Sequence, residues 1–394
     1  MSNAALVRRI RRAHTWAAVG SIAVVAASLT ACGSSEEAGS SDTATSGAAT
    51  SEGSDSASAD LEQYTQPLDA YPVPTEPVGD VSSLAGKTIF YIPISQQAPA
   101  FQVAAKALTA AADTVGVDVQ VCDGKGTPTD ISACINRATS SQAGVIVADA
   151  IEYGLAGNAF DAAQAAGIPV IISNQLPDDE HPASDTLTYI LPGGTRMDEA
   201  LATWITADSG GDAQVIINMS TDGRSPAAYV AAAQDVYDES CPDCKVVINE
   251  ISASSASLIP SSMSSALLQN PDVTYVESQF EQYVQAVQSG IQQTSRTGIK
   301  VVTGAATLNS VKAVEAGSLA AAAGQASAFQ GWVDMDAALR LMLGTDVPDY
   351  TIPVRLFTQD TMDDVELTQE ANESGAWFGP TTFPEDFQAV WGNG

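Results

Sequence analysis

The chain has 394 residues, and its 47 Asp and Glu residues outnumber 16 Lys and Arg residues, giving a formal net charge of −31. This acidic balance argues against nucleic-acid binding, because phosphate binding needs a basic surface. It also argues against electrostatic attachment to anionic lipid.

The first 31 residues have the composition of a signal peptide. Four arginines lie between residues 8 and 12 with no acid nearby, and an apolar stretch follows from about residue 16 to 29. This stretch is too short to be a convincing membrane span. It ends in Leu29-Thr30-Ala31-Cys32, which resembles the lipobox of bacterial lipoproteins, where the cysteine receives a diacylglycerol. We expect cleavage before Cys32 and lipidation of Cys32; the alternative is an ordinary signal peptide followed by an unrelated cysteine.

A polar segment follows the lipobox. Residues 33 to 59 contain no large apolar side chain, so they cannot bury enough surface to become ordered. Four prolines then follow between residues 67 and 77, and we predict a tether over residues 32–83. Residues 1–31 hold four arginines and no acid, so their removal changes the net charge to −31 − 4 = −35. A lipid anchor of two or more chains is sufficient for stable attachment to the membrane.

Of the five cysteines, four remain besides Cys32, an even number that suits disulfide bonds in an oxidising compartment. Proximity favours the pairs Cys122–Cys134 and Cys241–Cys244. The second pair forms a CxxC motif, for which a redox function is the alternative. A second CxxC at zinc-binding spacing does not occur, so we expect no metal site.

Short apolar strands alternate with helices from residue 87 onward. We predict strands at 88–95, 117–122, 144–148 and 168–173, and helices at 100–115, 130–142 and 155–166. A second series has helices at 198–207, 227–240, about 257–268, 282–294 and 308–315, and strands at 213–219, 245–251, 273–277 and 299–303. Continuous apolar strands separated by helices indicate a parallel sheet that is covered on both faces.

The repeated unit predicts an α/β fold with two doubly wound parallel-sheet lobes, a hinge and an interlobe cleft. The cleft faces the carboxyl ends of the strands, where open sheets bind ligands. We assign residues 84–190 plus about 326–345 to the first lobe and 191–325 to the second, with hinge linkers near 189–194 and 325–330. Residues 346–394 should form a C-terminal strand and a clasp, because exposed aromatic residues there would favour aggregation. These aromatic residues are Trp377, Phe378, Phe383, Phe387 and Trp391.

The order of these segments resembles the type I periplasmic-binding-protein superfamily, and within it the ribose- and galactose-type sugar-binding components of ABC importers. The resemblance is carried by Phe101, residues 116–123, 167–171, 270–273 and 312–317, Gln325 and the helix at 332–344. It implies a small-molecule ligand, an ABC permease as partner, no cofactor, a monomer, and a location at the outer face of the cytoplasmic membrane.

Matching positions imply the ligand contacts. Phe101 falls on the aromatic wall that stacks on a sugar ring, although it could also pack its helix on the sheet. Asn174 and Gln175 replace an Asp-Arg pair that binds hydroxyl groups, and amides can replace these contacts without charge. Gln325 matches the family's hinge glutamine, and Tyr153 is a further candidate that core packing explains equally well.

In the second lobe, Arg224 falls where sugar binders place an arginine, and it could bind a hydroxyl or a carboxylate or pair with Asp222. Phe280, with Glu281 beside it, and Ala305 replace polar residues of the family. An unpaired hydroxyl buried against them would cost about 1 to 3 kcal/mol. The sequence therefore favours a less hydroxylated ligand than a free pentose or hexose, such as a small aromatic or carboxylic compound, whereas the family favours a sugar.

Other functional classes remain as alternatives. His181 is the only histidine after the signal peptide, and neither GxSxG nor HExxH occurs, so we expect no catalytic residues and no enzyme activity. A ligand-sensing lipoprotein that contacts a membrane receptor is the stronger alternative to an importer component. A purely structural surface lipoprotein is the third.

Overall fold

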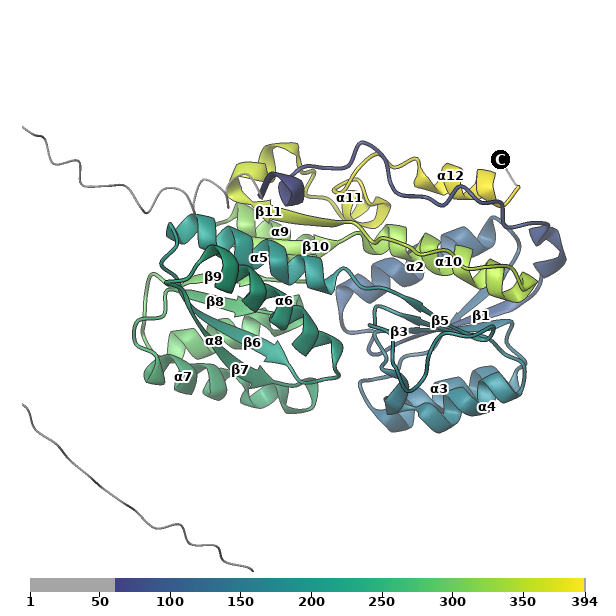
Figure 1. Ribbon diagram of the computed structural model, residues 1–394, viewed down its shortest axis with the longest axis horizontal. Helices are drawn as coiled ribbons and strands as arrows, with labels where there is room; N and C mark the ends of the chain where they lie inside the picture. The colour runs from purple at the N-terminus through teal and green to yellow at the C-terminus, as the bar shows by residue number, and fades with distance from the viewer. Residues whose placement is uncertain (1–60, 393–394) are drawn as a thin grey trace, which may run out of the picture. The chain divides into compact units, whose positions relative to one another are not determined.

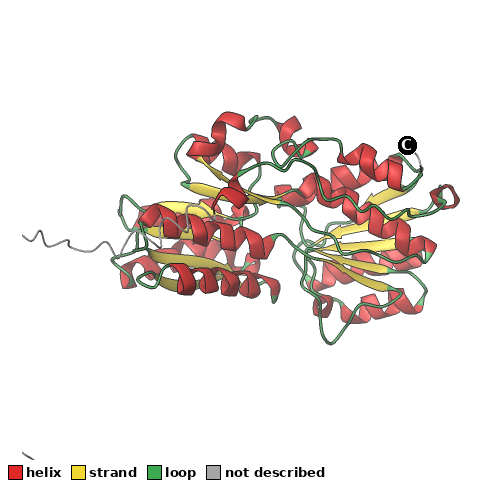
Figure 2. Cartoon of the chain, turned by 45° about the horizontal axis from the view of Figure 1, so that its top comes forward, coloured by secondary structure: helices red, strands yellow, loops and turns green. Residues whose placement is uncertain are grey.

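The computed structural model describes residues 61–392, so the predicted signal peptide, Cys32 and the first part of the tether lie outside the described residues. Two open sheets with helices on both faces make up most of this part of the chain (Figures 1 and 2). This confirms the predicted α/β fold with two parallel-sheet lobes.

The first lobe contains a five-stranded parallel sheet of order β2-β1-β3-β4-β5. Its strands are β1 (Thr88–Pro93), β2 (Asp118–Val121), β3 (Val145–Asp149), β4 (Val170–Ser173) and β5 (Leu187–Ile190). Its helices are α2 (Pro99–Asp113), α3 (Pro128–Ser140), α4 (Gly157–Ala165) and α10 (Ser327–Leu343). Apolar side chains of α2 and α10 share one core with the sheet, and those of α3 and α4 form a second core on its other face.

The second lobe contains a six-stranded sheet of order β11-β10-β9-β8-β6-β7, in which only β11 runs antiparallel to its neighbour. Its strands are β6 (Gln214–Ser220), β7 (Lys245–Ile251), β8 (Tyr275–Ser278), β9 (Lys300–Thr303), β10 (Ala321–Gln325) and β11 (Val354–Thr358). Helices α5 (Gly194–Ser209) and α6 (Ser225–Ser240) cover one face. The other face is covered by α7 (Ile259–Gln269), α8 (Val284–Gln293) and α9 (Leu308–Glu315).

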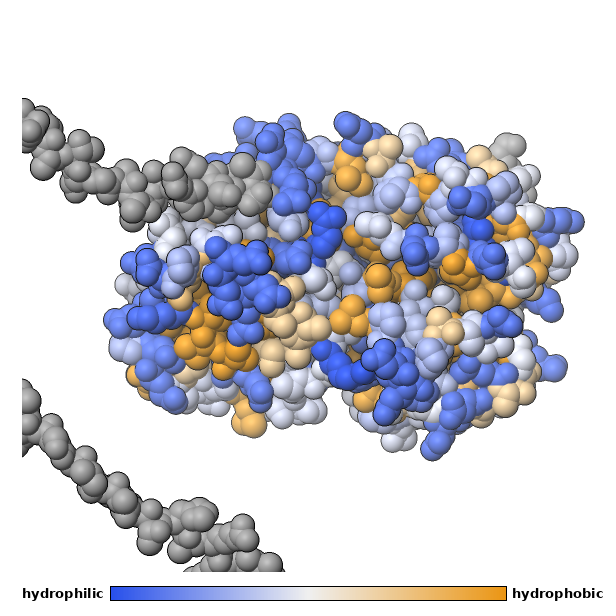
Figure 3. Space-filling view, viewed as in Figure 1, coloured by the Kyte–Doolittle hydropathy of each residue, from blue (hydrophilic) through white to orange (hydrophobic). Residues whose placement is uncertain are grey.

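Several short helices connect or cover the two sheets. These are the 3-10 helices η1 (Val81–Leu84), η2 (Tyr153–Leu155), η3 (Ala253–Leu258), η4 (Glu281–Tyr283) and η5 (Gln359–Asp364), and the α-helices α11 (Gln369–Ser374) and α12 (Phe383–Val390). Hydrophilic residues are spread over both lobes on the face shown in Figure 3, and a group of apolar residues lies on the second lobe.

The chain crosses between the lobes at three places: after β5, after β10 and before β11. At the first crossing, a Cβ on residue 193 would lie 2.8 Å from Val354 Cγ2 and 2.9 Å from Gln325 Cβ. The three crossing segments can therefore pack this closely only because residue 193 is glycine. Gly194 starts α5, and a Cβ there would lie 2.2 Å from the ring of Tyr229. Two hinge segments were predicted, and the third crossing, before β11, was not one of them.

The segment from residue 61 to 83 differs from the predicted tether, because it is folded onto the rest of the chain. Tyr64, Tyr71, Val78 and Val81 are buried, and the Tyr71 ring stacks on Phe329 of α10 with centroids 4.8 Å apart. The prolines in this segment led to the prediction of a tether. Its apolar residues are widely spaced, and each packs at a different place on the rest of the chain. The average composition of the segment therefore does not reveal that it is folded.

The C-terminal segment packs against both this N-terminal segment and the lobes. All five of its predicted aromatic residues are buried, and Trp391 stacks on Trp332 of α10 with centroids 5.5 Å apart. The buried Arg355 of β11 donates to two backbone carbonyls, Thr65 O at 2.9 Å and Trp377 O at 2.6 Å. Arg355 therefore fastens both terminal segments to the second sheet.

Candidate interlobe binding site

The candidate site lies where the carboxyl ends of the two sheets meet. After β4, Asn174 adopts a left-handed backbone conformation with φ 55°, which asparagine tolerates better than most residues. At the end of β10, Gln325 Nε2 donates to Asn174 Oδ1 at 2.9 Å and joins the second lobe to the first. Gln325 Oε1 also accepts a hydrogen bond from Gly193 N at 3.0 Å. Both predicted residues are therefore brought together at the crossing segments.

These amides belong to a larger polar network. Asn174 Nδ2 donates to Asp149 Oδ1 at 2.8 Å and to Gln330 Oε1 at 2.9 Å. Gln325 Nε2 also donates to Gln330 Oε1 at 2.7 Å, and Gln330 Nε2 donates to Ser173 Oγ at 3.1 Å and Asp149 Oδ2 at 3.4 Å. Each amide nitrogen has two protons, so every amide donor of this network is already used. The oxygens of Asn174 and Gln325 each keep one free lone pair.

The carboxylates beneath this network are fully buried. Tyr91 donates its hydroxyl to Asp149, and Ser173 Oγ donates to Asp334 Oδ1 at 2.7 Å. Burial raises the pKa of Asp149 although it accepts hydrogen bonds, and burial together with the charge of Asp149 raises the pKa of Asp334 well above its usual range. These buried carboxyl groups therefore lie beneath the amides of Asn174 and Gln330 and fix their orientation.

The second lobe has its own cluster of buried polar side chains behind the strand ends. Gln279 Nε2 donates to Asp198 Oδ2 at 3.0 Å and to Pro226 O at 2.8 Å, and its Oε1 accepts from Ser220 N at 2.9 Å. Burial raises the pKa of Asp198 to about 8, and it raises the pKa of Glu277 well above its usual range. Gln279, which follows β8, therefore joins the end of β6 to α5 and α6.

Two adjacent residues at the start of α6 contact the first lobe directly. Arg224 forms ion pairs with Glu152 and with Asp178, the latter with an Nη2 to Oδ1 distance of 3.2 Å. Ser225 Oγ donates to Gln175 Oε1 at 2.6 Å and accepts from Leu176 N at 3.2 Å. Asp222, the expected alternative partner of Arg224, instead accepts from Ala253 N at 2.8 Å and from the hydroxyl of Tyr283 at 3.1 Å.

Other predicted contacts are held within a single lobe. Tyr153 is 2% exposed; its hydroxyl donates to Asp161 and accepts from Gln164, and its ring stacks on His181. Both Glu281 carboxylate oxygens accept from Thr307 just before α9, and burial raises the pKa of Glu281. Its neighbour Phe280 is half-buried and packs on the core of the second lobe. Phe101, in the first turn of α2, is half-buried.

Residues of the site that were not predicted include Asp149, Glu152, Asp178 and Gln330. A signal for the first two is present in the sequence, because Asp149 ends the apolar strand 145–149 and Glu152 follows three residues later. Polar residues at strand ends meet at one edge of a parallel sheet. Asp178 and Gln330 carry no such signal, because they lie in a loop and in a helix.

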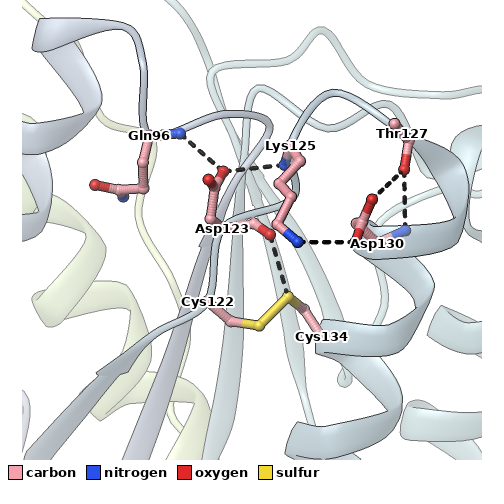
Figure 4. Close-up of a disulfide and its surroundings, with 7 residues drawn as sticks. All are labelled: Gln96, Cys122, Asp123, Lys125, Thr127, Asp130 and Cys134. Atoms are coloured by element: carbon pink, nitrogen blue, oxygen red, sulfur yellow. Dashed lines mark hydrogen bonds and ion pairs between the residues drawn. A yellow bond between two sulfur atoms is a disulfide. The ribbon is translucent and has the colours of Figure 1, made fainter.

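The predicted cysteine pairs are bonded in the structure. The first links β2 to α3, and Figure 4 shows Asp123, next to Cys122, accepting from the backbone nitrogens of Gln96 and Lys125. The second lies at the carboxyl end of α6, where a helix does not stabilise a thiolate. Cys241 and Cys244 line a cavity of about 610 Å³ beside the start of β7, away from the carboxyl ends of the strands.

Within the described residues 61–392, no helix is long and apolar enough to cross a membrane. The same part of the chain holds no group of three or more His, Cys, Asp or Glu side chains that could bind a metal ion.

The chain belongs to the periplasmic binding protein family, because the model of the periplasmic binding protein domain matches residues 89–346. Membership of this family assigns it to binding proteins and not to enzymes. Comparison with curated protein sequences gives no match.

Solved structures with the same fold include several binding proteins. A 5-methylthioribose transporter solute binding protein from Thermotoga lettingae, in complex with 5-methylthioribose, has 18% identity and a TM-score of 0.66, covering 81% of this chain and 100% of that chain. A Mycobacterium smegmatis protein in complex with β-D-fucofuranose has 18% identity and a TM-score of 0.63, covering 74% and 98%. An ABC transporter solute binding protein from Agrobacterium vitis with bound allitol has 18% identity and a TM-score of 0.62, covering 71% and 98%.

Proposed function

We infer that the protein is the extracytoplasmic solute-binding lipoprotein of an ABC importer, and that it captures a sugar or a sugar-like polyol between its lobes by hinge closure. Cys32 would carry the lipid at the outer face of the cytoplasmic membrane, and the monomeric protein would deliver its ligand to a permease. Family membership and the bound sugars or polyols of the similar structures support this proposal.

One observation favours a hydroxylated, uncharged ligand. All amide donors of Asn174, Gln325 and Gln330 are used within the protein, while oxygens of Asn174 and Gln325 remain able to accept. A hydroxyl group can donate to such an oxygen, whereas a carboxylate cannot. The proposed ligand contacts are therefore Asn174 and Gln325; the predicted contacts Gln175 and the ring of Phe101, as an apolar wall, complete the proposal.

A less hydroxylated ligand is the second candidate, since the half-buried Phe280 and Ala305 reduce the polar surface of the second lobe. A small aromatic compound with one or two hydroxyl groups would satisfy both this apolar part and the acceptors of the hinge. The carboxylic compounds that the sequence also allowed are disfavoured, because Arg224 already pairs with two carboxylates.

A ligand panel tests the proposal. Purified protein is heated with 5-methylthioribose, allitol, allose, myo-inositol, catechol, benzoate or glutamate, and the melting temperature is recorded. Stabilisation follows from ligand binding to the folded state. We expect one or more of the uncharged hydroxylated compounds to raise the melting temperature. Stabilisation by benzoate or glutamate alone would refute the proposed ligand class.

A further inference from the structure

We propose that Arg224, Glu152 and Asp178 form an interlobe latch that holds the two lobes together without contacting the ligand. The inference rests on the hinge closure of the proposed function and concerns its regulation. The ion pairs join α6 of the second lobe to the segments that follow β3 and β4 of the first.

One acceptor of the latch, Asp178, is preorganised. Asp178 Oδ1 accepts from Glu180 N at 3.0 Å, and Asp178 Oδ2 lies 3.0 Å from His181 Nδ1. His181 in turn stacks on the buried Tyr153 with ring centroids 4.0 Å apart, and its carbonyl accepts from the hydroxyl of Tyr189 at 2.7 Å. The loop therefore holds Asp178 in place before the lobes meet, and only Arg224 loses freedom when the pair forms.

Gly223, directly before Arg224, allows the turn that brings the arginine to the first lobe. Gly223 has φ 123°, a conformation that side-chain-bearing residues rarely adopt, and the position of its missing Cβ lies 3.5 Å from Glu152 Oε2. The turn places Arg224 and Ser225 side by side against the first lobe. The hydrogen bond from Leu176 N to Ser225 Oγ thus forms and breaks with the same movement of the lobes as the ion pairs.

The latch has two functional consequences. Its ion pairs exist only while the lobes are together, so they shift the population toward the closed arrangement. The Arg224 side chain is 60% exposed, so salt should screen the pairs and weaken closure even when the ligand carries no charge. Because two carboxylates neutralise Arg224, it also offers no free positive charge to an anionic ligand.

Hydrogen exchange of the Leu176 amide in the ligand-free full chain tests the latch. Arg224→Gln and Glu152→Gln each remove one side of the ion pair, and the double variant removes both. Lys125→Gln is the matched control, because Lys125 is 63% exposed and pairs with Asp130 inside the first lobe. The amide of Val147 in β3 reports on unfolding of the lobe itself.

At about 0.02 M salt we expect the Leu176 amide to exchange several-fold faster in Arg224→Gln than in the unaltered protein. In Lys125→Gln it should exchange at the rate of the unaltered protein. The exchange rate of the Val147 amide should be the same in all of these proteins. The double variant should be no faster than Arg224→Gln, and about 0.5 M salt should bring the unaltered protein close to the variant rate. Equal Leu176 rates in Arg224→Gln and the unaltered protein at low salt would overturn the latch, and so would an equal acceleration by Lys125→Gln. The measurement needs no ligand, so its failure is distinct from a failure of the ligand panel.

Discussion

Gln325 of the second lobe donates its amide to Asn174 of the first lobe across 2.9 Å, at the place where the chain passes between them. The same amide nitrogen donates to Gln330, so the ends of β4 and β10 and the start of α10 share one network. A ligand that binds here contacts the hinge itself, which couples its binding to the arrangement of the lobes.

Replacing Asn174 with alanine should weaken ligand binding by about tenfold or more. The change removes the oxygen that would accept from the ligand, and a ligand hydroxyl left unpaired in the site costs about 1 to 3 kcal/mol. Calorimetric titration with the compound that the ligand panel identifies measures the loss. Asn158→Ala, on the exposed face of α4, is the control and should bind normally; equal affinity of both variants would exclude Asn174 from the site.

Gly194→Ala should destabilise the fold by about 1 to 3 kcal/mol, because the new Cβ would lie 2.2 Å from the Tyr229 ring and force the start of α5 away from α6. Denaturant unfolding measures this free energy. Gly154→Ala is the control, since no atom lies within 4 Å of its Cβ position. The close packing would be disproved by equal stability of the two variants.

The layered fold could be predicted because periodicity and strand polarity are local properties of the sequence. The strand β10 escaped prediction because Ala321, Ala322 and Ala323 have little strand preference. These alanines are fully buried between the helices on the two faces of the sheet, where small side chains fit. Tertiary packing decides this strand.

The site could be predicted only in part. Asn174 and Gln325 were expected from the positions that they match in the family, and the structure joins them. Whether their amide groups are free to bind a ligand depends on Gln330, which hydrogen-bonds to both. Gln330 lies in a helix and is more than 150 residues from Asn174 in the sequence, so this contact could not be predicted. The partners of Arg224 were missed for the same reason, since Glu152 and Asp178 are distant in the chain and near in space.

Asp198 should make stability depend on pH. Its pKa in the folded chain is raised to about 8 by burial, above the usual value of 3.8, so the stability that its protonated form contributes is present below about pH 4 and is lost as the pH rises through 8. The loss amounts to about 1.4 kcal/mol per pH unit within this window. Asp198→Asn keeps the oxygen that accepts from Gln279 and removes this dependence.

Urea unfolding between pH 4 and 8 compares the unaltered chain with Asp198→Asn. We expect the variant to gain stability relative to the unaltered protein as the pH rises. Asp235→Asn removes one charge from the exposed face of α6 and serves as the control. Parallel profiles for the unaltered protein and Asp198→Asn would show that Asp198 is ionised in the folded state.

Arg355→Lys should loosen both terminal segments together. Lysine keeps the charge but cannot reach Thr65 O and Trp377 O with one planar group, so at least one buried carbonyl loses its partner, at a cost of about 1 to 3 kcal/mol. Limited proteolysis should then cut within residues 61–71 and 365–378 sooner than in the unaltered protein. Arg137→Lys, at an exposed position of α3, should leave the cleavage pattern unchanged; accelerated cleavage at only one terminus would contradict a shared attachment.

Mass spectrometry of the small molecules released on denaturation tests both the proposed ligand class and the contribution of Asn174 to binding. The protein and its Asn174→Ala variant are purified from the native host, and the released compounds are compared. We expect the unaltered protein to release an uncharged polyhydroxylated compound and the variant to release at least about tenfold less. A carboxylic acid released in equal amounts by both proteins would contradict this expectation.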